Sequence, residues 1–384
     1  MPNIFNTPFK IGILGGGQLG KMLGQAASPW DLHISVLDAD RHFPAAATCT
    51  EFVVGDFRNY DDVLAFGRQV DLLTIEIESV NSEALHQLVS EGLTVHPHPT
   101  ALDLIKDKGD QKQFYKERGL PSSSFELFAD RASILKALDA GSLSLPFVQK
   151  LRTGGYDGRG VAVIRRPAEL ELLMDGPSVV EELVDIDKEL AVIVARNESG
   201  AVAAYPPVEM DFNPEANLVE WLLSPAQIDD ETARRATELA RQVIEAYGIC
   251  GLLAVEMFLT PTGELLVNEV APRPHNSGHH TIDSSYTSQF EQHLRAILNL
   301  PLGSTHMKTP SVMVNLLGEP GYEGQARYEG MEKVLALEGV KPHLYGKVMT
   351  KPFRKMGHVT ILDSDLDRAR TKARQVKDLL KVIA

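Results

Sequence analysis

The feature that most constrains the fold is a short apolar stretch at residues 9–14 that runs directly into the glycine-rich turn Gly15-Gly16-Gly17-Gln18-Leu19-Gly20. The stretch has the length of a buried strand, and apolar residues recur at helical spacing from Leu19 to Ala26. Further strand signals follow at residues 32–37, 51–54 and 72–77. This strand–helix–strand order predicts an open, mostly parallel, Rossmann-like α/β sheet over residues 1–100.

The glycine turn has three interpretations. Gly15, Gly17 and Gly20 have the spacing of a dinucleotide fingerprint, and Asp38 lies at the end of the next strand. Amide groups at a helix N-terminus attract any phosphate, so a phosphorylated substrate fits the pattern as well as NAD(P) does. A tight turn with only a structural role is the third interpretation. We favour a phosphate ligand other than NAD(P), and the spacing alone leaves all three open.

The remaining chain divides into two further regions. A Pro-rich passage at residues 96–99 marks a boundary, and a polar helix follows at about residues 102–118. Residues 101–305 mix strands and helices without strict alternation, including a helix at residues 230–247, and predict an α+β domain. Strands at residues 312–317 and 359–362, and a final helix capped by Ser364, predict a small domain over residues 306–384.

Composition excludes several classes of protein. The chain has 38 Lys and Arg residues against 52 Asp and Glu, and its net charge of −14 disfavours binding to nucleic acid or anionic membranes. No apolar run approaches the roughly 18 residues of a membrane helix. Only Cys49 and Cys250 are present, which makes a disulfide framework implausible and predicts a reduced, cytoplasmic setting.

A second glycine cluster, at residues 150–160, is crowded with cations. Four glycines occur there within seven residues, together with the basic residues Lys150, Arg152 and Arg159, directly after an apolar strand-like stretch. Such a loop closes over phosphates with its backbone amides while the cations supply charge. An exposed turn is the alternative, and the density of cations in an acidic chain argues against it.

The strongest inference from the residues concerns two glutamates. Two apolar runs, residues 253–260 and 265–270, flank the turn sequence Pro261-Thr262-Gly263-Glu264. A four-residue hairpin loop pairs Thr260 with Leu265, and counting outward pairs residue 258 with 267 and Glu256 with Glu269. The two carboxylates then lie opposite each other, with Cβ atoms about 4.5–5.5 Å apart.

Two facing carboxylates repel unless one is protonated or a cation bridges them. Mg²⁺ binds one or two carboxylates together with substrate phosphates, so it would unite this hairpin with the second glycine cluster in one nucleotide site. A pair of solvated glutamates is the alternative. The same count places Asn268 on the other face, so a role for Asn268 at the metal would need a bulge.

Polar residues follow the hairpin directly. The segment at residues 271–280 contains Pro and Gly and predicts a loop, in which Arg273, His275 and Asn276 are candidates for holding a small anion. Zinc binding by His275 and His279 is disfavoured, because no helix holds that spacing across Pro274 and Gly278. Near the C-terminus a basic cluster predicts either a solvated face or a phosphate clamp; its members are Lys347, Lys351, Arg354, Lys355 and His358.

Three motifs resemble one known family. They are Gly15-Gly16-Gly17-Gln18-Leu19-Gly20-Lys21-Met22, the segment at residues 152–160, and Asn268-Glu269-Val270-Ala271-Pro272-Arg273-Pro274-His275-Asn276-Ser277-Gly278-His279. Together they are similar to N5-carboxyaminoimidazole ribonucleotide synthetases, which are ATP-grasp ligases. The resemblance implies a three-domain ATP-grasp fold, usually a homodimer, that uses ATP and Mg²⁺ to carboxylate 5-aminoimidazole ribonucleotide with bicarbonate through carboxyphosphate.

The resemblance also implies residue roles. Around ATP it implies Lys108 and Lys150 as basic contacts, Gly155, Tyr156, Asp157, Gly158, Arg159 and Gly160 as the loop over the phosphates, Glu181, Glu182 and Val184 as the adenine hinge, Glu189 on the ribose, and Asn268 beside Glu269. It implies Glu256 and Glu269 as ligands of Mg²⁺ or Mn²⁺, and Arg273, His275 and Asn276 as the bicarbonate pocket, with these three and Lys355 as the catalytic residues. Around aminoimidazole ribonucleotide it implies Gln18, Leu19, Glu78, Tyr156, Asp157, Lys347, Arg354 and Lys355, so that the first glycine turn serves a substrate phosphate.

The sequence departs from the family pattern at three places. Lys21 stands where Arg is usual, Val161 where Gln is usual, and Phe212 where His is common, which puts nucleotide contacts near Phe212 in question. A formate-dependent ribonucleotide transformylase is an alternative within the ATP-grasp enzymes. An NAD-dependent oxidoreductase is an alternative from another class, but it leaves the facing glutamates without a purpose.

Overall fold

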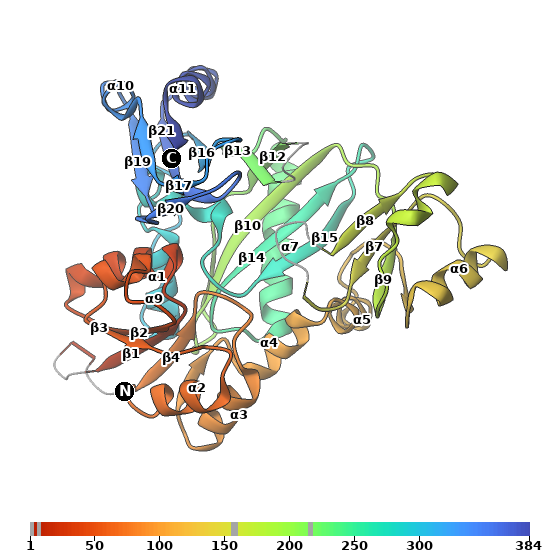
Figure 1. The fold of residues 1–384 in the computed structure, drawn as a ribbon, viewed down its shortest axis with the longest axis horizontal. Helices are drawn as coiled ribbons and strands as arrows, with labels where there is room; N and C mark the ends of the chain where they lie inside the picture. Colours follow the sequence, from red (N-terminus) through yellow and green to blue (C-terminus); the bar gives the residue numbers. More distant parts are fainter. Residues whose placement is uncertain (1–3, 6–8, 155–159, 214–217) are drawn as a thin grey trace.

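The computed structural model describes residues 4–5, 9–154, 160–213 and 218–384. Within these residues the three largest sheets have five, four and nine strands. Figure 1 shows the five-stranded sheet near the N-terminus, the four-stranded sheet at the opposite end of the molecule, and long central strands between them. The first sheet is parallel and the other two are antiparallel, which confirms the expected combination of α/β and α+β regions.

The N-terminal sheet is built as the apolar pattern predicts. Its strands are β1 (Lys10–Leu14), β2 (His33–Asp38), β3 (Glu51–Val54), β4 (Leu72–Ile75) and β5 (Thr94–His96). They run parallel in the order β3-β2-β1-β4-β5. The connecting elements are α1 (Gln18–Ala27), η1 (Ser28–Trp30), η2 (Pro44–Ala47), α2 (Tyr60–Gly67) and α3 (Ser82–Ser90). The carboxyl ends of β1 and β4 therefore lie side by side, at the edge where open parallel sheets bind ligands.

The segment after this sheet corrects one prediction. The polar helix expected over residues 102–118 is two helices, α4 (Pro99–Lys106) and α5 (Lys108–Arg118). Asp107 separates them because its backbone is extended and its carboxylate accepts the amides of Gly109 and Asp110, which caps α5. Arg152 holds Asp107 in place with a contact of 2.7 Å between Nε and Oδ1.

The four-stranded sheet forms a separate lobe. It consists of β6 (Phe125–Phe128), β7 (Phe147–Leu151), β8 (Val161–Ile164) and β9 (Ser178–Glu182), in the order β6-β9-β7-β8. Helix α6 (Arg131–Asp139) and the 3₁₀ helix η3 (Pro167–Leu172) cover it. Its small core includes Ile134, Phe147 and Val180. Because β7 leads into the second glycine cluster, this sheet carries that loop.

The nine-stranded sheet joins the middle of the chain to its C-terminal region. Its strands are β10 (Lys188–Arg196), β11 (Val202–Ala204), β12 (Val208–Asn213), β13 (Leu218–Ser224), β14 (Gly251–Leu259), β15 (Leu265–Ala271), β16 (Ser311–Leu317), β19 (Val340–Leu344) and β21 (Lys355–Leu362). The order is β15-β14-β10-β12-β13-β16-β21-β19, with β11 paired to β10. The C-terminal strands thus continue the central sheet through the pairing of β13 with β16. The proposed domain divisions at residues 100 and 305 stay predictions.

Two helices cover opposite faces of β10 and β14. Helix α7 (Asp230–Tyr247), as predicted, begins at the capping side chain of Asp229 and ends at Gly248 in the left-handed region. It packs in one core cluster with Val192 of β10. Helix α9 (Gln289–Ile297) packs instead with the N-terminal sheet and α1. His293 of α9 contacts Thr74 at 3.0 Å and accepts the amide of Leu252, so α9 ties β4 to β14.

The C-terminal region adds small elements around β16, β21 and β19. They are α8 (Thr281–Ser284), η4 (Asn276–Gly278), β17 (Gly324–Gln325), β18 (Arg327–Glu329), α10 (Met331–Leu335), β20 (Met349–Thr350), α11 (Leu366–Leu379) and β22 (Lys381–Ile383). The predicted apolar stripe of α11 is buried at Ala369, Ala373 and Val376. The predicted cap Ser364 is wrong, because Asp365 supplies the capping carboxylate. Among the described helices, none combines the length and apolar character needed to cross a membrane.

Candidate active site

The hairpin of β14 and β15 brings the two predicted glutamates together. Glu256 pairs with Glu269, as the count from the turn predicts. The predicted turn itself is wrong, because Leu259 rather than Thr260 pairs with Leu265, and Phe258 rather than Leu259 pairs with Leu266. The ladder shifts by one residue at Asn268, between the pairs Met257–Val267 and Glu256–Glu269. This bulge compensates for the different turn and restores the glutamate pair.

The two glutamates have opposite electrostatic environments. Burial, followed by the charges of Glu269 and Glu189, raises the pKa of Glu256 to about 8. Burial also acts to raise the pKa of Glu269, but Lys108 in direct contact with it, together with Lys150 and Arg273, outweighs burial and lowers that pKa. Glu256 is therefore mainly protonated at neutral pH and Glu269 is ionised, so the facing pair carries about one negative charge, on Glu269.

Two cations from different elements converge on this hairpin. Lys108 at the start of α5 binds Glu269. Lys150 of β7 donates to Asn268 Oδ1 at 3.0 Å and lies 3.1 Å from Glu181 Oε1. The bulge at Asn268 is what places this side chain within reach of Lys150. The structure thus brings together five of the residues for which the resemblance implies nucleotide contacts.

A buried polar network behind Glu181 was missed by the sequence analysis. Lys112 is 2 % exposed, and its Nζ lies 2.9 Å from Ser123 Oγ and 3.5 Å from Glu181 Oε2. Ser123 donates to the same carboxylate oxygen at 2.5 Å. Burial lowers the pKa of Lys112 to about 8. Burial acts to raise the pKa of Glu181, but the charges of Lys150 and Lys112 outweigh burial and lower the pKa of Glu181. The available signal was the position of Lys112 one helical turn after Lys108 on α5.

The other predicted nucleotide residues lie on neighbouring elements. Glu182 ends β9 with an exposed side chain, and Val184 follows it. Glu189 lies on β10 on the same face of the sheet as Glu256, and burial raises its pKa to about 7. Gly160 adopts a φ of 75° and accepts the amide of Leu151. The predicted residues Gly155, Tyr156, Asp157, Gly158 and Arg159 lie outside the described residues, as does the side chain of Phe212.

The loop after β15 lies between the hairpin and the N-terminal sheet. His275 Nε2 is 3.7 Å from Glu256 Oε1, and its Nδ1 is 2.9 Å from Ser277 Oγ. Arg273 Nε lies 2.9 Å from Glu78 Oε1, just beyond the end of β4. Asn276 begins the 3₁₀ helix η4. Within the described part of the chain, no group of three or more His, Cys, Asp or Glu side chains is arranged to hold a metal, so a metal here would take the two glutamates and oxygens from its substrates.

A cavity of about 340 Å³ lies between the N-terminal sheet and the C-terminal region. Gln18, Glu76, Lys347 and Arg354 line it, so it unites three residues expected around the ribonucleotide. Lys347 donates to the carbonyl of Lys355 at 2.8 Å, which places Lys355 next to the cavity wall. Leu19 is not part of the lining, because its side chain is buried in the core under α1.

The first glycine turn already holds carboxylates. The amide of Gly16 donates to Asp38 Oδ2 at 2.6 Å, and the amides of Gly17 and Gly20 donate to the two oxygens of Glu76. A Cβ on Gly17 would lie 2.6 Å from Glu76 Oε1, so a glycine is needed there for the approach of Glu76. Glu76 was missed because it lies directly after β4, 59 residues further along the chain than Gly17. The amides of Gly16, Gly17 and Gly20 are therefore satisfied by protein groups.

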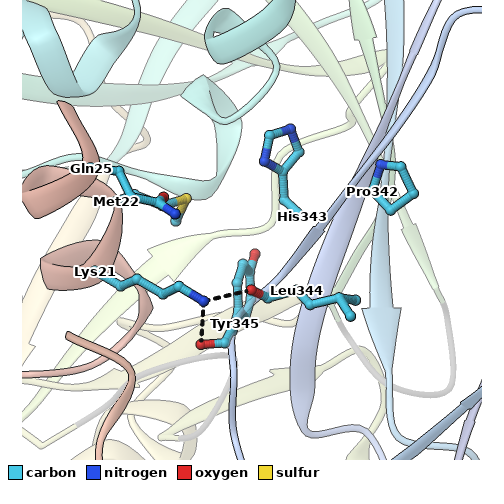
Figure 2. A pocket seen from close by; sticks show the side chains of 7 residues that line it. All are labelled: Lys21, Met22, Gln25, Pro342, His343, Leu344 and Tyr345. Atoms are coloured by element: carbon cyan, nitrogen blue, oxygen red, sulfur yellow. Dashed lines mark hydrogen bonds between the residues drawn. The ribbon is translucent and has the colours of Figure 1, made fainter. Parts of the chain in front are cut away.

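A smaller cavity of about 170 Å³ lies between α1 and β19 (Figure 2). In it Lys21, which stands where the family usually has Arg, donates to the carbonyls of Leu344 and Tyr345 at 3.0 and 3.4 Å. Burial lowers the pKa of Lys21. The residue at this position thus joins the N-terminal helix to a C-terminal strand through its ammonium group.

Comparisons with known proteins agree with this arrangement. Three family models match in order: "Ribonucleotide synthetase preATP-grasp domain" over residues 9–106, "ATP-grasp domain" over residues 113–290, and "Phosphoribosylaminoimidazole carboxylase C-terminal domain" over residues 311–372. The crystal structure of N5-carboxyaminoimidazole ribonucleotide synthetase from Thermotoga maritima is 44 % identical with a TM-score of 0.90, and the match covers 98 % of this chain and 99 % of that one. The chain belongs to the N5-carboxyaminoimidazole ribonucleotide synthetase family.

Other members of the N5-carboxyaminoimidazole ribonucleotide synthetase family extend the comparison. The Aspergillus clavatus synthase, solved in complex with ADP and 5-aminoimidazole ribonucleotide, is 32 % identical with a TM-score of 0.88 over 98 % of this chain and 99 % of that one. The chloroplastic phosphoribosylaminoimidazole carboxylase of Vigna aconitifolia is 40 % identical over 365 residues, which cover 93 % of this chain and 64 % of the relative. The chain thus spans slightly less than two thirds of that curated relative. The ATP-grasp fold expected from the motifs is confirmed.

Proposed function

We propose that this chain is an ATP-dependent ligase that carboxylates 5-aminoimidazole ribonucleotide with bicarbonate, and releases N5-carboxyaminoimidazole ribonucleotide, ADP and phosphate. The observation that carries the proposal is the convergence of Lys108 and Lys150 on the Glu256–Glu269 hairpin, next to the loop of Arg273 and His275. The Aspergillus clavatus relative, whose complex contains ADP and 5-aminoimidazole ribonucleotide, supports the same substrates.

Mg²⁺, or Mn²⁺ in its place, is the cation that the hairpin would hold. The donor set fits, because Glu256 and Glu269 offer hard carboxylate oxygens on one side and ATP phosphates complete the coordination. Burial, and then the negative charges of Glu269 and Glu189, raise the pKa of Glu256, and this repulsion is the second observation in favour of a cation. When bound, the ion supplies charge neutralisation on the transferred phosphoryl group.

The residues of the chain supply positioning and electrostatic stabilisation. In the proposed mechanism Lys108 and Lys150 neutralise the ATP phosphates, and Arg273, His275 and Asn276 hold bicarbonate so that its oxygen attacks the γ-phosphate in line. The charge of Lys355 acts on both Glu256 and His275, so Lys355 adds positive charge to this pocket. No side chain forms a covalent bond, and the glycine cluster at residues 154–160 excludes the water that would hydrolyse carboxyphosphate.

The 340 Å³ cavity is the proposed site for 5-aminoimidazole ribonucleotide. Lys347 and Arg354 provide the phosphate charges, while Gln18 and Glu78 are the proposed polar contacts nearer the ring and ribose. The proposed setting is a cytoplasmic homodimer, as the resemblance implies. An NAD-dependent oxidoreductase is disfavoured, because Asp38 and Glu76 use the amides that a pyrophosphate would need.

The test is ADP release from the purified chain with ATP and Mg²⁺. We expect release to require bicarbonate and to increase at least about tenfold on addition of 5-aminoimidazole ribonucleotide, with formate unable to replace bicarbonate. Formation of the carboxylated product, trapped with ¹⁴C-bicarbonate, would identify the acceptor. Stimulation by formate instead would favour the transformylase, and ATP binding without stimulation by the nucleotide would refute the proposed acceptor.

A further inference from the structure

The loop that carries Arg273, His275 and Asn276 is held from behind by one buried amide side chain. Gln289 is the first residue of α9 and is fully buried. Its Oε1 accepts the backbone amide of His275 at 2.9 Å, and its Nε2 donates to the backbone carbonyl of His275 at 2.7 Å. The side chain therefore pairs with both backbone groups of His275, as a neighbouring β-strand would.

The same amide fixes a second ring. Gln289 Nε2 lies 3.0 Å from His279 Nδ1, and because Nε2 is only a donor, Nδ1 must accept. The side-chain amide of Gln289 then uses both of its N–H donors and its carbonyl acceptor in hydrogen bonds to this loop. Burial lowers the pKa of His279 to about 3, which agrees with an unprotonated Nδ1. His279 in turn packs against Phe290 and His358, with ring centroids 5.8 and 4.7 Å apart.

The loop is shaped to admit this amide. A Cβ on Gly278 would lie 2.6 Å from Gln289 Cδ and would overlap Oε1, so a side chain at residue 278 would displace the amide. The backbone amide of Gln289 donates to Thr281 Oγ1 at 2.8 Å, and Thr281 donates to the carbonyl of Gly278 at 2.5 Å. The segment from His275 to Thr281 thus contacts Gln289 at His275, Gly278, His279 and Thr281.

We propose that Gln289 is a positioning residue for the bicarbonate end of the active site. It acts through His275, whose backbone it clamps and whose ring stands 3.7 Å from Glu256. Gln289 itself is buried behind the loop and does not line the cavity. The inference rests on the proposed role of His275 in holding bicarbonate. Displacement of a reacting group by about 1 Å is enough to reduce a rate by about a hundredfold.

The chain contains a matched control on the same helix. Gln292 is also fully buried on α9, and its amide also pairs with both backbone groups of one residue. That residue is Gly303, which contacts Gln292 Nε2 and Oε1 at 2.9 and 2.8 Å. Gly303 lies in the connection to β16 and lines neither described cavity. Equal substitutions at the two positions therefore remove the same pair of backbone hydrogen bonds from different loops, and at residue 289 the contact with His279 as well.

The experiment compares Gln289→Glu and Gln289→Leu with Gln292→Glu and Gln292→Leu in the full chain. Bicarbonate is titrated in the ADP-release assay, ADP affinity is measured by calorimetry, and the thermal midpoint is recorded for each variant. At residue 289 we expect the KM for bicarbonate to rise at least about tenfold while ADP affinity stays within about twofold. At residue 292 we expect both quantities to stay within about threefold of the wild type, even where the midpoint falls equally.

Gly278→Ala gives an independent variant, because it should displace Gln289 and reproduce the rise in the KM for bicarbonate. Equal bicarbonate effects at residues 289 and 292, or an unchanged KM in the Gln289 variants, would overturn the positioning role. If the Gln289 variants do not fold, hydrogen exchange of the wild type decides, since rapid exchange of the His275 amide contradicts the clamp. A wild-type chain without bicarbonate-dependent turnover would instead refute the proposed function, and the inference would fall with it.

Discussion

Glu269→Gln separates the chemistry of the hairpin from its stability. The substitution keeps the shape of the side chain and removes the ionised carboxylate of the facing pair. Only the contact with Lys108 is lost directly, and Glu269 is 51 % exposed, so that ion pair contributes about 0.2–1 kcal/mol. Relief of the repulsion with Glu256 acts in the opposite direction. We therefore expect the free energy of unfolding to change by less than about 1 kcal/mol.

The expected loss of activity is much larger. Removing one electrostatic contact to a reacting group typically costs about 2.7–4 kcal/mol, which corresponds to a rate reduced about 10²- to 10³-fold. The assay is ADP release in the presence of Mg²⁺, bicarbonate and 5-aminoimidazole ribonucleotide, with denaturant unfolding measured on the same preparation. Glu264→Gln is the matched control, because Glu264 is exposed in the turn of the same hairpin. Turnover by Glu269→Gln within threefold of the wild type would refute the metal assignment, and an equal loss in Glu264→Gln would attribute the effect to the hairpin as a whole.

Two further predictions concern stability. Lys112→Met should lower the free energy of unfolding by about 3–5 kcal/mol, because it leaves the buried Glu181 with one cation fewer. Lys116→Met on the exposed face of α5 is the control and should change the free energy of unfolding by less than about 0.5 kcal/mol. Equal denaturation midpoints for the two variants would contradict the buried pair of Lys112 and Glu181. Burial lowers the pKa of His280 and of His293 to about 3 in the folded chain. As the pH falls below about 6.5, these histidines therefore take up protons in the unfolded chain before they do so in the folded one. Their contribution to the free energy of unfolding is full above that pH and is lost progressively toward pH 3. The thermal midpoint should therefore decrease as the pH is lowered from 7 to 4.5. A midpoint that does not change with pH over this range would show that these rings are not held neutral.

The elements that sequence reasoning found are those with local causes. The parallel strands of the N-terminal sheet are short apolar runs, and α7 has an N-cap and a terminating glycine within its own sequence. The break between α4 and α5 was missed because the conformation of Asp107 is stabilised by Arg152, which lies 45 residues away. Local patterns carry no information about such a partner.

The hairpin shows how a correct result can conceal a wrong intermediate step. The sequence count assumed a four-residue loop and a regular ladder, and the structure has neither, since Leu259 pairs with Leu265 and the ladder shifts at Asn268. The two differences cancel at Glu256 and Glu269. The bulge places the side chain of Asn268 in contact with Lys150, which belongs to another sheet. Strand periodicity carries no information about that partner, so it cannot predict the bulge.

The polar contacts behind the site were the least predictable part. Glu76 binds the first glycine turn from the position directly after β4, and Gln289 clamps His275 from α9. Both are polar residues that the sequence marks as ordinary surface or helix positions. Their roles arise because backbone groups from a different segment need partners once they are buried, and only the assembled structure shows which side chain supplies them.

The pairing of β13 with β16 has a consequence for dividing the protein into fragments. Trp221, Leu222, Leu223 and Ser224 pair with residues 311–314, so a cut near residue 305 leaves these backbone groups paired only while both fragments stay together. Separate expression of residues 306–384 would expose β16 as an open apolar edge, which is a template for aggregation with other chains. Co-expression of the two fragments would cover that edge, and recovery of a soluble, non-covalent complex is the expected result.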